Sequence, residues 1–322
     1  MTPFDFRPAD RPTFYFIGVT TTKSSIMKVF PLWAQHLGLG DCPIRGIDCQ
    51  WHDDPEVYRK IVNFLKKDEL SQGALVTTHK LDLLKAARDL FDGLGPYARQ
   101  LDEVSSISKR NGKLLGHAKD PITSGLSLDA FVPGDYWART GGEICILGAG
   151  GSSLALTISL MQRPNEERPT KIHVTNRSEK RLAEMQKVHD EIAYPIPIEY
   201  RLCPTASEND QVVAQLKPHS LVINATGLGK DAPGSPLSEA AEFPENGLAW
   251  DFNYRGDLVF LDQARAQKEA KQLHVEDGWV YFIHGWTQVI AEVFDIDIPT
   301  SGPGFEELSR IAAETRRYSV SR

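Results

Sequence analysis

The sequence predicts a two-domain α/β protein, with an N-terminal α/β domain built on a mainly parallel sheet and a second α/β domain after it. Two observations carry this prediction. Short apolar runs typical of strands alternate with segments of helical spacing along the chain, and such alternation favours parallel sheets flanked by helices. The length of 322 residues also exceeds what a single hydrophobic core usually organises.

The first half of the chain consists of strand and helix units. Residues 14–19 are a short aromatic and apolar run containing a glycine, which is typical of a buried strand, and residues 27–37 repeat apolar side chains at helical spacing. The elements expected next are a strand at 43–48, a helix at 55–67, a strand at 73–77, a helix at 81–94 and two strands within 104–115. Asn111 and Gly112 predict a tight hairpin turn between the last two strands.

The second half repeats this pattern after a linker that proline and glycine residues predict within 133–142. Strands are expected at 143–147, 171–175, 221–224 and 248–252, and helices at 281–294 and 304–318. Because two helices after the last strand cannot complete a crossover, we expect them to return to the first domain. The expected domains are therefore residues 1–122 joined by 281–322, and residues 123–280.

Composition and charge argue against several classes of protein. A net charge of -7 without a basic segment predicts no general affinity for nucleic acid and no basic membrane-binding face. No run approaches the roughly 18 to 20 apolar residues of a membrane span, and charged residues within 1–12 replace the apolar centre of a signal peptide, so we expect a cytoplasmic protein. The 4 cysteines form no CxxC pair and have no zinc-finger spacing, so we expect no metal site.

A glycine-rich turn follows the strand expected at 143–147 and leads into a helix. Such a turn lets backbone N–H groups approach a pyrophosphate, whose charge the helix N-terminus stabilises. The residues expected to take part are Gly148, Ala149, Gly150, Gly151, Ser152 and Ser153, with Ser153 at the usual position of a third glycine. We therefore expect the second domain to be a Rossmann-like domain that binds a dinucleotide.

The end of the next strand favours NADP over NAD. A carboxylate at this place binds the ribose 2′-hydroxyl of NAD, whereas an arginine accommodates the 2′-phosphate of NADP. Arg177 lies here without an acidic residue at the strand end, and Arg181 falls one helical turn further on the same face. We expect NADP as the cofactor, with NAD less favoured; the alternative for both arginines is a solvated helix start.

The order of these motifs resembles the shikimate/quinate dehydrogenase family over nearly the whole chain. The run from Gly148 to Gly151 resembles the GAGG loop of that family, and Asn176-Arg177-Ser178 resembles its NR(T/S) motif. Asn224-Ala225-Thr226 resembles the NAT segment beside the nicotinamide. The run from Asp251 to Tyr254 resembles the D-x-x-Y strand end. The resemblance implies that the first three segments bind NADP and that Tyr254 contacts the substrate.

In the first domain the resemblance implies a catalytic pair. Lys80 ends a run that resembles GxNVTxPxK and matches the catalytic lysine, although the run is one residue shorter and lacks the asparagine and proline. Asp120 ends a run that resembles G-x-N-T-D and matches the catalytic aspartate. In alcohol oxidation Lys80 would take the hydroxyl proton while the nicotinamide takes the hydride. Without the resemblance, a surface ion pair would be the simpler interpretation of these two residues.

The substrate contacts that the resemblance implies are less complete. Lys23-Ser24-Ser25-Ile26 aligns with the HSxSP segment, whose two serines hold the substrate carboxylate, so one serine matches and Ile26 takes the second position. The other expected pocket residues are Thr77, Ser105, Ser106, Tyr254, His284 and Gln288. His284 and Gln288 lie four residues apart on one expected helix, but His284 is equally compatible with a packed core histidine.

These observations predict an NADP-dependent dehydrogenase that moves hydride reversibly between NADP and a secondary alcohol of a hydroxylated carboxylate or a polyol. Because polar contacts to shikimate are altered, and an unpaired substrate group is unfavourable, we expect a small-molecule substrate other than shikimate itself. The enzyme is expected to be a monomer or a homodimer. Two alternatives stay open: a non-catalytic NADP-binding regulatory protein of the same fold, and an enzyme like methylenetetrahydrofolate dehydrogenase.

Overall fold

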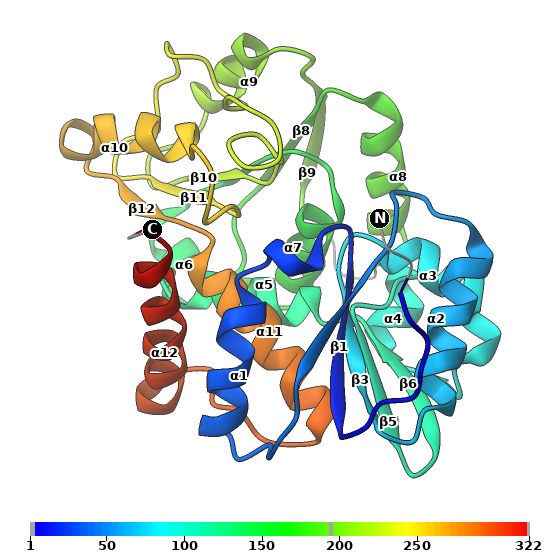
Figure 1. The fold of residues 1–322 in the computed structure, drawn as a ribbon. Coiled ribbons are helices and arrows are strands. Elements are labelled where there is room, and N and C mark those ends of the chain that lie inside the picture. The colour runs from blue at the N-terminus through cyan, green and yellow to red at the C-terminus, as the bar shows by residue number, and fades with distance from the viewer. Residues whose placement is uncertain (1–3, 193–195, 321–322) are drawn as a thin grey trace. The chain divides into compact units, whose positions relative to one another are not determined.

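The computed structural model of this chain describes residues 4–192 and 196–320. The chain forms two compact units (Figure 1). One unit contains the residues up to Lys119 and those from Ile283 onward, and the other contains Asp120–Phe282. Each unit is built around one six-stranded sheet with helices beside it, which confirms the predicted α/β fold class.

The first unit has a sheet of strand order β2-β1-β3-β5-β6-β4. Its strands are β1 (Thr13–Gly18), β2 (Ile44–Asp48), β3 (Ser71–Val76), β4 (Gly93–Leu94), β5 (Ser106–Arg110) and β6 (Lys113–His117). Its helices are η1 (Thr21–Lys23), α1 (Ile26–His36), α2 (Pro55–Lys67), α3 (Lys80–Ala87), η2 (Arg88–Leu90), α4 (Pro96–Leu101), α11 (Trp279–Phe294, from Ile283 on) and α12 (Gly302–Val320). Strand β1 pairs in parallel with both β2 and β3, so the carboxyl ends of these three strands share one edge.

Alternating side chains on β1 explain how this sheet is covered on both faces. Phe16 contacts Trp286 of α11, with ring centroids 4.9 Å apart, whereas the neighbouring Tyr15 contacts Phe64 of α2 at 5.6 Å. Successive strand residues point to opposite faces, so the aromatic run serves two helical layers. Figure 1 shows these layers, with α1, α11 and α12 on one face and α2, α3 and α4 on the other.

The second unit is a fully parallel sheet of strand order β12-β11-β10-β7-β8-β9. Its strands are β7 (Ile144–Leu147), β8 (Ile172–Asn176), β9 (Ile198–Leu202), β10 (Leu221–Asn224), β11 (Leu248–Asp251) and β12 (His274–Glu276). Its helices are α5 (Asp120–Asp129), α6 (Tyr136–Thr140), α7 (Gly151–Met161), η3 (Asn165–Glu167), α8 (Glu179–Asp190), α9 (Ala206–Val213) and α10 (Val259–Lys271). Strand β7 lies at the centre, where the strand order reverses, and ligands of doubly wound sheets bind at such a point.

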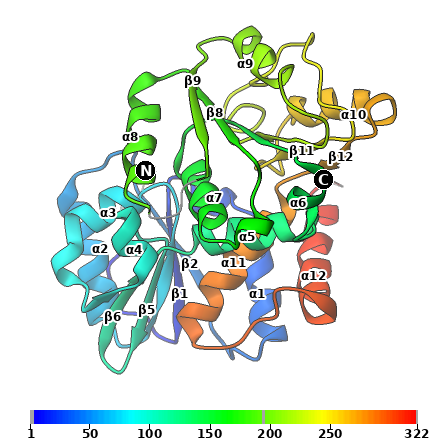
Figure 2. The same ribbon diagram turned by 180° about the vertical axis from the view of Figure 1, so that it is seen from behind.

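Two apolar clusters cover the two faces of this second sheet. Ile146 and Ile223 face a cluster that includes residues of α5, α7 and α8, while Leu147 and Val222 face residues of α9 and α10. Figure 2 shows α5, α6 and α7 against one face of the sheet. Within the described ranges, a search for a helix long and apolar enough to cross a membrane finds none.

The structure corrects several sequence-based expectations about the elements. The helix expected at 81–94 ends at Ala87. Gly93 and Leu94 form strand β4 instead, which pairs with β6. The linker expected at 133–142 contains α6, whose Trp137 is 1% exposed. The predicted hairpin turn is confirmed: Asn111 and Gly112 have φ of +52° and +74° between β5 and β6, as a type I′ turn requires.

Candidate active site

The glycine-rich loop lies at the carboxyl end of β7, where the order of the second sheet reverses. Gly148 has a φ of +112°, which residues other than glycine rarely adopt. A Cβ at this position would lie 3.0 Å from the carbonyl oxygen of Ala225. A Cβ on Gly150 or Gly151 would meet nothing within 4 Å. The loop is therefore closely packed at its start and open after that, which leaves room for a ligand to approach its backbone.

Helix α7 begins directly after this loop. Gly150 is its N-cap, and Gly151 and Ser152 open the first turn, where backbone N–H groups have no partner within the helix. Ser153 is fully buried, and its hydroxyl donates to the carbonyl of Gly148 at 2.6 Å. The serine at the third-glycine position therefore braces the loop, and the N-terminus of α7 could hold a pyrophosphate. Ala149 is 8% exposed and belongs to the apolar cluster beneath.

The end of β8 carries the two arginines of the sequence analysis. Asn176 is the last strand residue, and its amide donates to the carbonyl of Ser178 at 3.2 Å. Ser178 is the N-cap of α8, and its hydroxyl accepts from the Arg181 backbone N–H. Arg177 is exposed, whereas Arg181 forms an ion pair with Glu184 at 3.1 Å. Because Arg181 already has an acidic partner, Arg177 is the stronger candidate for contact with a 2′-phosphate.

Buried amide and carboxyl groups fix the loop that follows β10. The Asn224 side-chain oxygen accepts from the Thr226 backbone N–H at 3.0 Å and from its hydroxyl at 2.6 Å. The Asn224 amide donates to Asp251 at 3.0 Å, and Asp251 also accepts from the Asn253 backbone N–H at 2.8 Å. The Asn253 amide in turn donates to the Thr226 carbonyl at 3.1 Å. Two strand ends therefore hold the Asn224-Ala225-Thr226 segment against Gly148, which places it beside the glycine-rich loop.

Asp251 is the buried centre of this hydrogen-bond network. Its side chain is fully buried, and burial raises the pKa of Asp251 to about 6 while the hydrogen bonds from Asn253 and Asn224 oppose the shift. The sequence pattern marked this strand end, but it did not indicate that Asn253 completes the network. Tyr254, expected to contact the substrate, packs its ring against Phe282 at 4.8 Å and Trp279 at 5.5 Å.

Lys80 lies at the carboxyl edge of the first sheet, as the first residue of α3 after β3. The Thr77 backbone N–H donates to the Ile17 carbonyl at 3.0 Å and so ties this turn to β1. Thr77 and Lys80 are partly buried, while Thr78 between them is exposed with a φ of +58°. The Lys80 carbonyl accepts from the Val104 backbone N–H at 3.3 Å, which connects this segment to the chain before β5.

The segment before Asp120 is anchored by Ser105. The Ser105 backbone N–H donates to the His117 carbonyl at 2.9 Å, and the Ser105 hydroxyl accepts from the Lys119 backbone N–H at 2.8 Å. Ser105 is 3% exposed and Ser106 is fully buried. This geometry does not favour the expectation that the two hydroxyls line a pocket, because Ser105 positions residues 117–119 and Ser106 is buried. Asp120 itself is partly buried and is the first residue of α5, in the second unit.

A charged cluster that the sequence analysis did not find lies behind this segment. Lys119, at the position where the family pattern has threonine, forms an ion pair with Glu292 of α11. The same carboxylate lies 3.3 Å from Nδ1 of His117 and 3.3 Å from the guanidinium of Arg110. Glu292 is 13% exposed. Its ion pairs therefore join α11 to the end of β6 in a mostly buried place.

The Lys23–Ile26 segment leads from η1 into α1, after the end of β1. Asp48 accepts from the Thr21 hydroxyl at 2.6 Å and from its backbone N–H at 2.8 Å, which fixes the start of this segment. Lys23 is exposed, and Ser24 and Ser25 are partly exposed. Ile26, in contrast, is fully buried in the core of the first unit. The position that aligns with the second serine of the family segment is therefore a core position in this chain.

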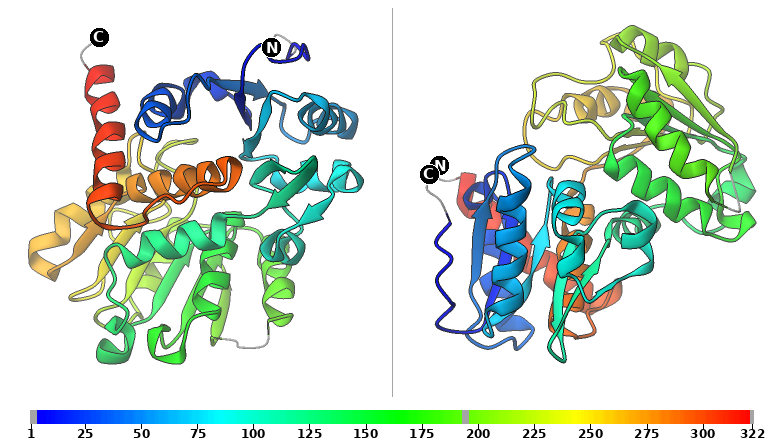
Figure 3. Two further views of the ribbon diagram at one scale, coloured as in Figure 1. Left: turned by 90° about the horizontal axis from the view of Figure 1, so that it is seen from below. Right: turned by 90° about the vertical axis from the view of Figure 1, so that its right-hand side faces the viewer.

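The two expected contacts on α11 differ in their surroundings. His284 is 1% exposed and stacks on Phe305 of α12, with ring centroids 4.3 Å apart, and burial lowers its pKa to about 4. This environment favours the interpretation as a packing histidine. Gln288 is partly buried on the same helix. Figure 3 shows α11 and α12, in orange and red, as consecutive helices.

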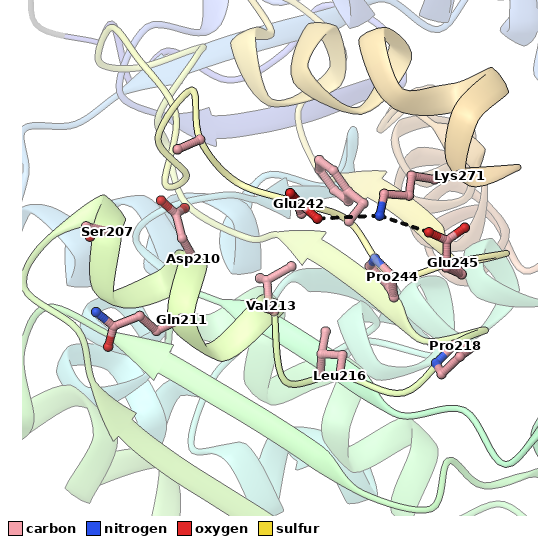
Figure 4. Close-up of a pocket in the computed structure, with 13 residues that line it drawn as sticks. Ser207, Asp210, Gln211, Val213, Leu216, Pro218, Glu242, Pro244, Glu245 and Lys271 are labelled. Carbon is pink, nitrogen blue, oxygen red and sulfur yellow. Dashed lines mark hydrogen bonds and ion pairs between the residues drawn. The ribbon is translucent and has the colours of Figure 1, made fainter.

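A separate surface hollow of about 520 Å³ lies on the second unit, lined by α9, the end of α10 and the segments before β10 and β11 (Figure 4). Lys271 at its rim pairs with Glu245 at 2.9 Å and with Glu242 at 3.5 Å. Its residues Pro218 and Pro244 precede the strands, so the hollow lies at the amino ends of β10 and β11. Dinucleotides bind at the carboxyl ends of such strands, and this hollow is therefore not the cofactor site.

Sequence comparison relates the chain to shikimate dehydrogenases. It is 28% identical to shikimate dehydrogenase (NADP(+)) of Streptococcus thermophilus over 179 residues, which are 55% of this chain and 58% of the relative. It is 25% identical to the Streptococcus sanguinis enzyme of the same description over 228 residues, 70% of this chain and 74% of the relative. The chain thus matches less than two thirds of the first relative. None of the family models compared with the chain matches it.

Solved structures share the fold over almost the whole chain. Shikimate dehydrogenase from Aquifex aeolicus superposes with a TM-score of 0.72 at 19% identity, covering 97% of this chain and 99% of that one. Quinate dehydrogenase from Corynebacterium glutamicum in complex with NAD gives a TM-score of 0.73 at 18% identity, with 95% and 100% covered. The 5-ketofructose reductase of a Gluconobacter strain gives 0.68 at 18% identity, with 96% and 99% covered. Sequence relatives and structural neighbours together confirm that this chain resembles the shikimate/quinate dehydrogenase family.

Proposed function

We propose that this chain is an NADP-dependent dehydrogenase of the shikimate/quinate type, which moves hydride reversibly between NADP and a secondary alcohol of a hydroxylated carboxylate or a polyol. The observation that carries the proposal is the glycine-rich loop at the switch point of the second sheet. It opens outward at Gly150 and Gly151 and lies against the Ala225–Thr226 segment. The curated relatives carry the description shikimate dehydrogenase (NADP(+)), which supports the same assignment.

The residues at the second sheet's carboxyl edge suit the parts of a dinucleotide. Backbone N–H groups of Gly150 to Ser152 would bind the pyrophosphate, and Arg177 would bind the 2′-phosphate of NADP through its planar guanidinium. The segment Asn224–Ala225–Thr226 would border the nicotinamide. Hydrogen bonds to Asp251 and Asn253 hold this segment in place. NADP, when bound, supplies the acceptor and donor of the hydride.

Lys80 and Asp120 would act on the substrate hydroxyl. In the direction of oxidation the hydroxyl proton passes to the Lys80 amine as the C–H hydride leaves, so that the alcohol becomes a carbonyl. In reduction the Lys80 ammonium returns the proton to the new alkoxide. Asp120 would hydrogen-bond the same hydroxyl and orient it. Lys23, Ser24 and Ser25, exposed or partly exposed at the start of α1, would receive an anionic or hydroxylated substituent.

The substrate is proposed to differ from shikimate in its polar groups away from the reacting carbon. Of the two serines in the family's carboxylate-binding segment only one is present, and the other position is the core residue Ile26. A carboxylate in this place would lose one hydrogen bond, which is worth about 1.5 to 3 kcal/mol for a charged group. The 5-ketofructose reductase neighbour supports the idea that this fold accommodates substrates other than shikimate.

The proposal is tested by binding and turnover together. Calorimetric titration of the purified protein should give tighter binding of NADP+ than of NAD+. NADPH formation is then followed with shikimate, quinate, and a panel of hydroxy acids and polyols, and at least one panel member should exceed shikimate in kcat/KM. Equal binding of both dinucleotides would refute the cofactor assignment. Preference for shikimate over the whole panel would refute the substrate proposal and leave the dehydrogenase assignment intact.

A further inference from the structure

The turn before Lys80 has an unfavourable backbone conformation. Thr78 has a φ of +58°, which is rare for a β-branched residue. The His79 backbone N–H bonds to the Thr77 carbonyl two residues earlier, which closes a γ-turn about Thr78. A γ-turn around a residue of positive φ is the rarer and more strained form. Such strain persists only where the surrounding structure holds it, and it gathers at functional sites.

The segment has a reason to be so tight. It resembles the family's GxNVTxPxK pattern but is one residue shorter and has His79 at the position of the proline. A shorter segment must still bring Lys80 from the end of β3 to the start of α3. The tight turn at Thr78 makes the shorter connection between β3 and α3. Because the proline ring is absent, another contact must restrain the backbone of this turn.

His79 supplies that restraint through Tyr58. His79 is 1% exposed, and its Nδ1 lies 3.0 Å from the hydroxyl of Tyr58 on α2. The Tyr58 hydroxyl also accepts from the Asp53 backbone N–H at 3.1 Å and lies 3.5 Å from the Gln50 carbonyl, so the segment before α2 holds the hydroxyl in place. Burial lowers the pKa of His79, while the Gly18 carbonyl, Asp82 and Asp53 oppose this shift, so burial favours a neutral ring as the partner of Tyr58.

The contact lies at the end of the α2–α3 interface nearest Lys80. The His79 carbonyl accepts from the Leu83 backbone N–H at 2.8 Å, so the same residue also opens the hydrogen bonding of α3. Near the other end of α3, Arg59, which follows Tyr58 on α2, donates to the Ala86 carbonyl at 2.8 Å. Figure 1 shows α2 and α3 side by side on one face of the sheet. These two contacts hold α3 near both of its ends, and of the two the Tyr58–His79 contact is adjacent to the lysine.

We propose that the hydrogen bond between Tyr58 and His79 is the positioning device that holds the strained turn at Thr78 and thereby sets the place of the Lys80 amine. Both residues act through Lys80 and touch no reacting atom. The proposal rests on the proposed function in taking Lys80 as the proton-transfer group.

Three substitutions separate positioning from simple packing. Tyr58→Phe keeps the ring and removes the hydroxyl. His79→Asn keeps a hydrogen-bonding group at the place of Nδ1, whereas His79→Gln moves the amide to the place of Nε2. Arg59→Ala is the matched control, because it removes a contact between the same two helices at the end of α3 away from Lys80. Folding of each variant is checked by thermal unfolding and by NADP+ binding, which the second unit provides.

The first readout needs no substrate. Competitive acetylation with acetic anhydride, followed by mass spectrometry, gives the labelling rate of Lys80 relative to Lys85, an exposed lysine on the same helix. Tyr58→Phe and His79→Gln should change this ratio several-fold, while His79→Asn and Arg59→Ala should keep the wild-type ratio. An unchanged ratio in folded Tyr58→Phe and His79→Gln would overturn the proposal. An equal change in His79→Asn would also overturn it, since packing alone would then explain the effect.

The second readout is turnover with the member of the panel of shikimate, quinate, hydroxy acids and polyols that the wild type oxidises fastest. Tyr58→Phe and His79→Gln should lower kcat by about 10- to 10²-fold, the scale expected for a catalytic group misplaced by about 1 Å. The Kd for NADP+ should stay unchanged, and His79→Asn should retain most of the activity. Normal kcat in both folded variants would overturn the proposal. Should the wild type oxidise no member of the panel, the proposed function loses support while the labelling ratio still decides this inference.

Discussion

Replacing Gly148 and Gly150 separately by alanine should lower stability at the first position only and weaken cofactor binding at both. Gly148 has a φ of +112°, and an added Cβ would lie 3.0 Å from the Ala225 carbonyl oxygen and 3.2 Å from the Thr226 side chain. Gly150 has an ordinary φ of -96°, and an added Cβ there would meet nothing within 4 Å. The two positions are two residues apart on one loop, so each serves as the control for the other.

The magnitudes follow from these environments. Gly148→Ala should lower the free energy of unfolding by about 1 to 3 kcal/mol, the usual range for an L-residue held in a sparsely populated backbone region. Gly150→Ala should leave it unchanged or raise it by up to about 1 kcal/mol, because alanine restricts the unfolded chain at a compatible position. In Gly150→Ala the new methyl group would occupy the space through which a pyrophosphate approaches the backbone. Loss of even one charge-assisted hydrogen bond, about 1.5 to 3 kcal/mol, weakens binding by at least roughly tenfold.

Urea unfolding without cofactor and calorimetric titration with NADP+ measure the two quantities independently. The expected pattern is lowered stability and weakened binding for Gly148→Ala, against full stability and weakened binding for Gly150→Ala. Wild-type affinity for NADP+ in Gly150→Ala would refute the placement of the pyrophosphate on this loop. Wild-type stability in Gly148→Ala would refute the backbone argument.

Three further predictions concern the cofactor, acid stability and the core. Arg177→Asp should reverse the preference for NADP+ over NAD+ in calorimetric titration, and Arg181→Ala should have a smaller effect because Arg181 pairs with Glu184. Burial lowers the pKa of His189 to about 4 between Thr157 and Tyr200. His189 therefore binds a proton in the unfolded chain that it does not bind in the folded chain, and it should contribute about 2 kcal/mol to the fall in unfolding free energy from about pH 7 to pH 5. The fall should shrink by this contribution in His189→Asn, and an identical pH profile in that variant would contradict the assignment. Ile26→Ser should lower the free energy of unfolding by about 3 to 5 kcal/mol in urea, because a hydroxyl replaces a fully buried side chain, and a stable variant with improved shikimate KM would show that Ile26 faces the substrate.

Periodicity and turn chemistry in the sequence were sufficient for elements whose local pattern agrees with their final environment. The aromatic run of β1 and the Asn111–Gly112 hairpin are of this kind. Helix α5 is not: its Gly125 packs closely enough on Ser159 of α7 that a Cβ would collide with it. A helix that packs through small residues carries no apolar stripe, so its spacing gives no signal. Strand β4 is a second example. It forms by pairing with β6, and the local sequence propensity of Gly93 and Leu94 does not indicate this pairing.

The candidate site shows the same division. The glycine-rich loop was predictable because one residue, Gly148, needs a backbone conformation that only glycine adopts readily. The polar residues were less predictable because a serine or histidine serves equally well in a ligand site or inside the protein. Ser105 uses its hydroxyl to hold the Lys119 backbone, and His284 stacks on Phe305. The Lys119–Glu292 ion pair joins residues 173 positions apart, which no local motif indicates.

The most direct test of the proposed function is NADPH formation by the wild-type protein and by Lys80→Ala, with NADP+ and the panel of shikimate, quinate, hydroxy acids and polyols. The proposal predicts that the wild type reduces NADP+ with at least one panel member. Lys80→Ala should lower kcat with that compound by about 10² to 10⁴-fold, the usual contribution of a general acid–base group, while the Kd for NADP+ stays unchanged. NADP+ binding without NADPH formation from any panel member would contradict the proposal and favour a non-catalytic NADP-binding protein, and near-normal kcat in Lys80→Ala would remove Lys80 from the chemistry.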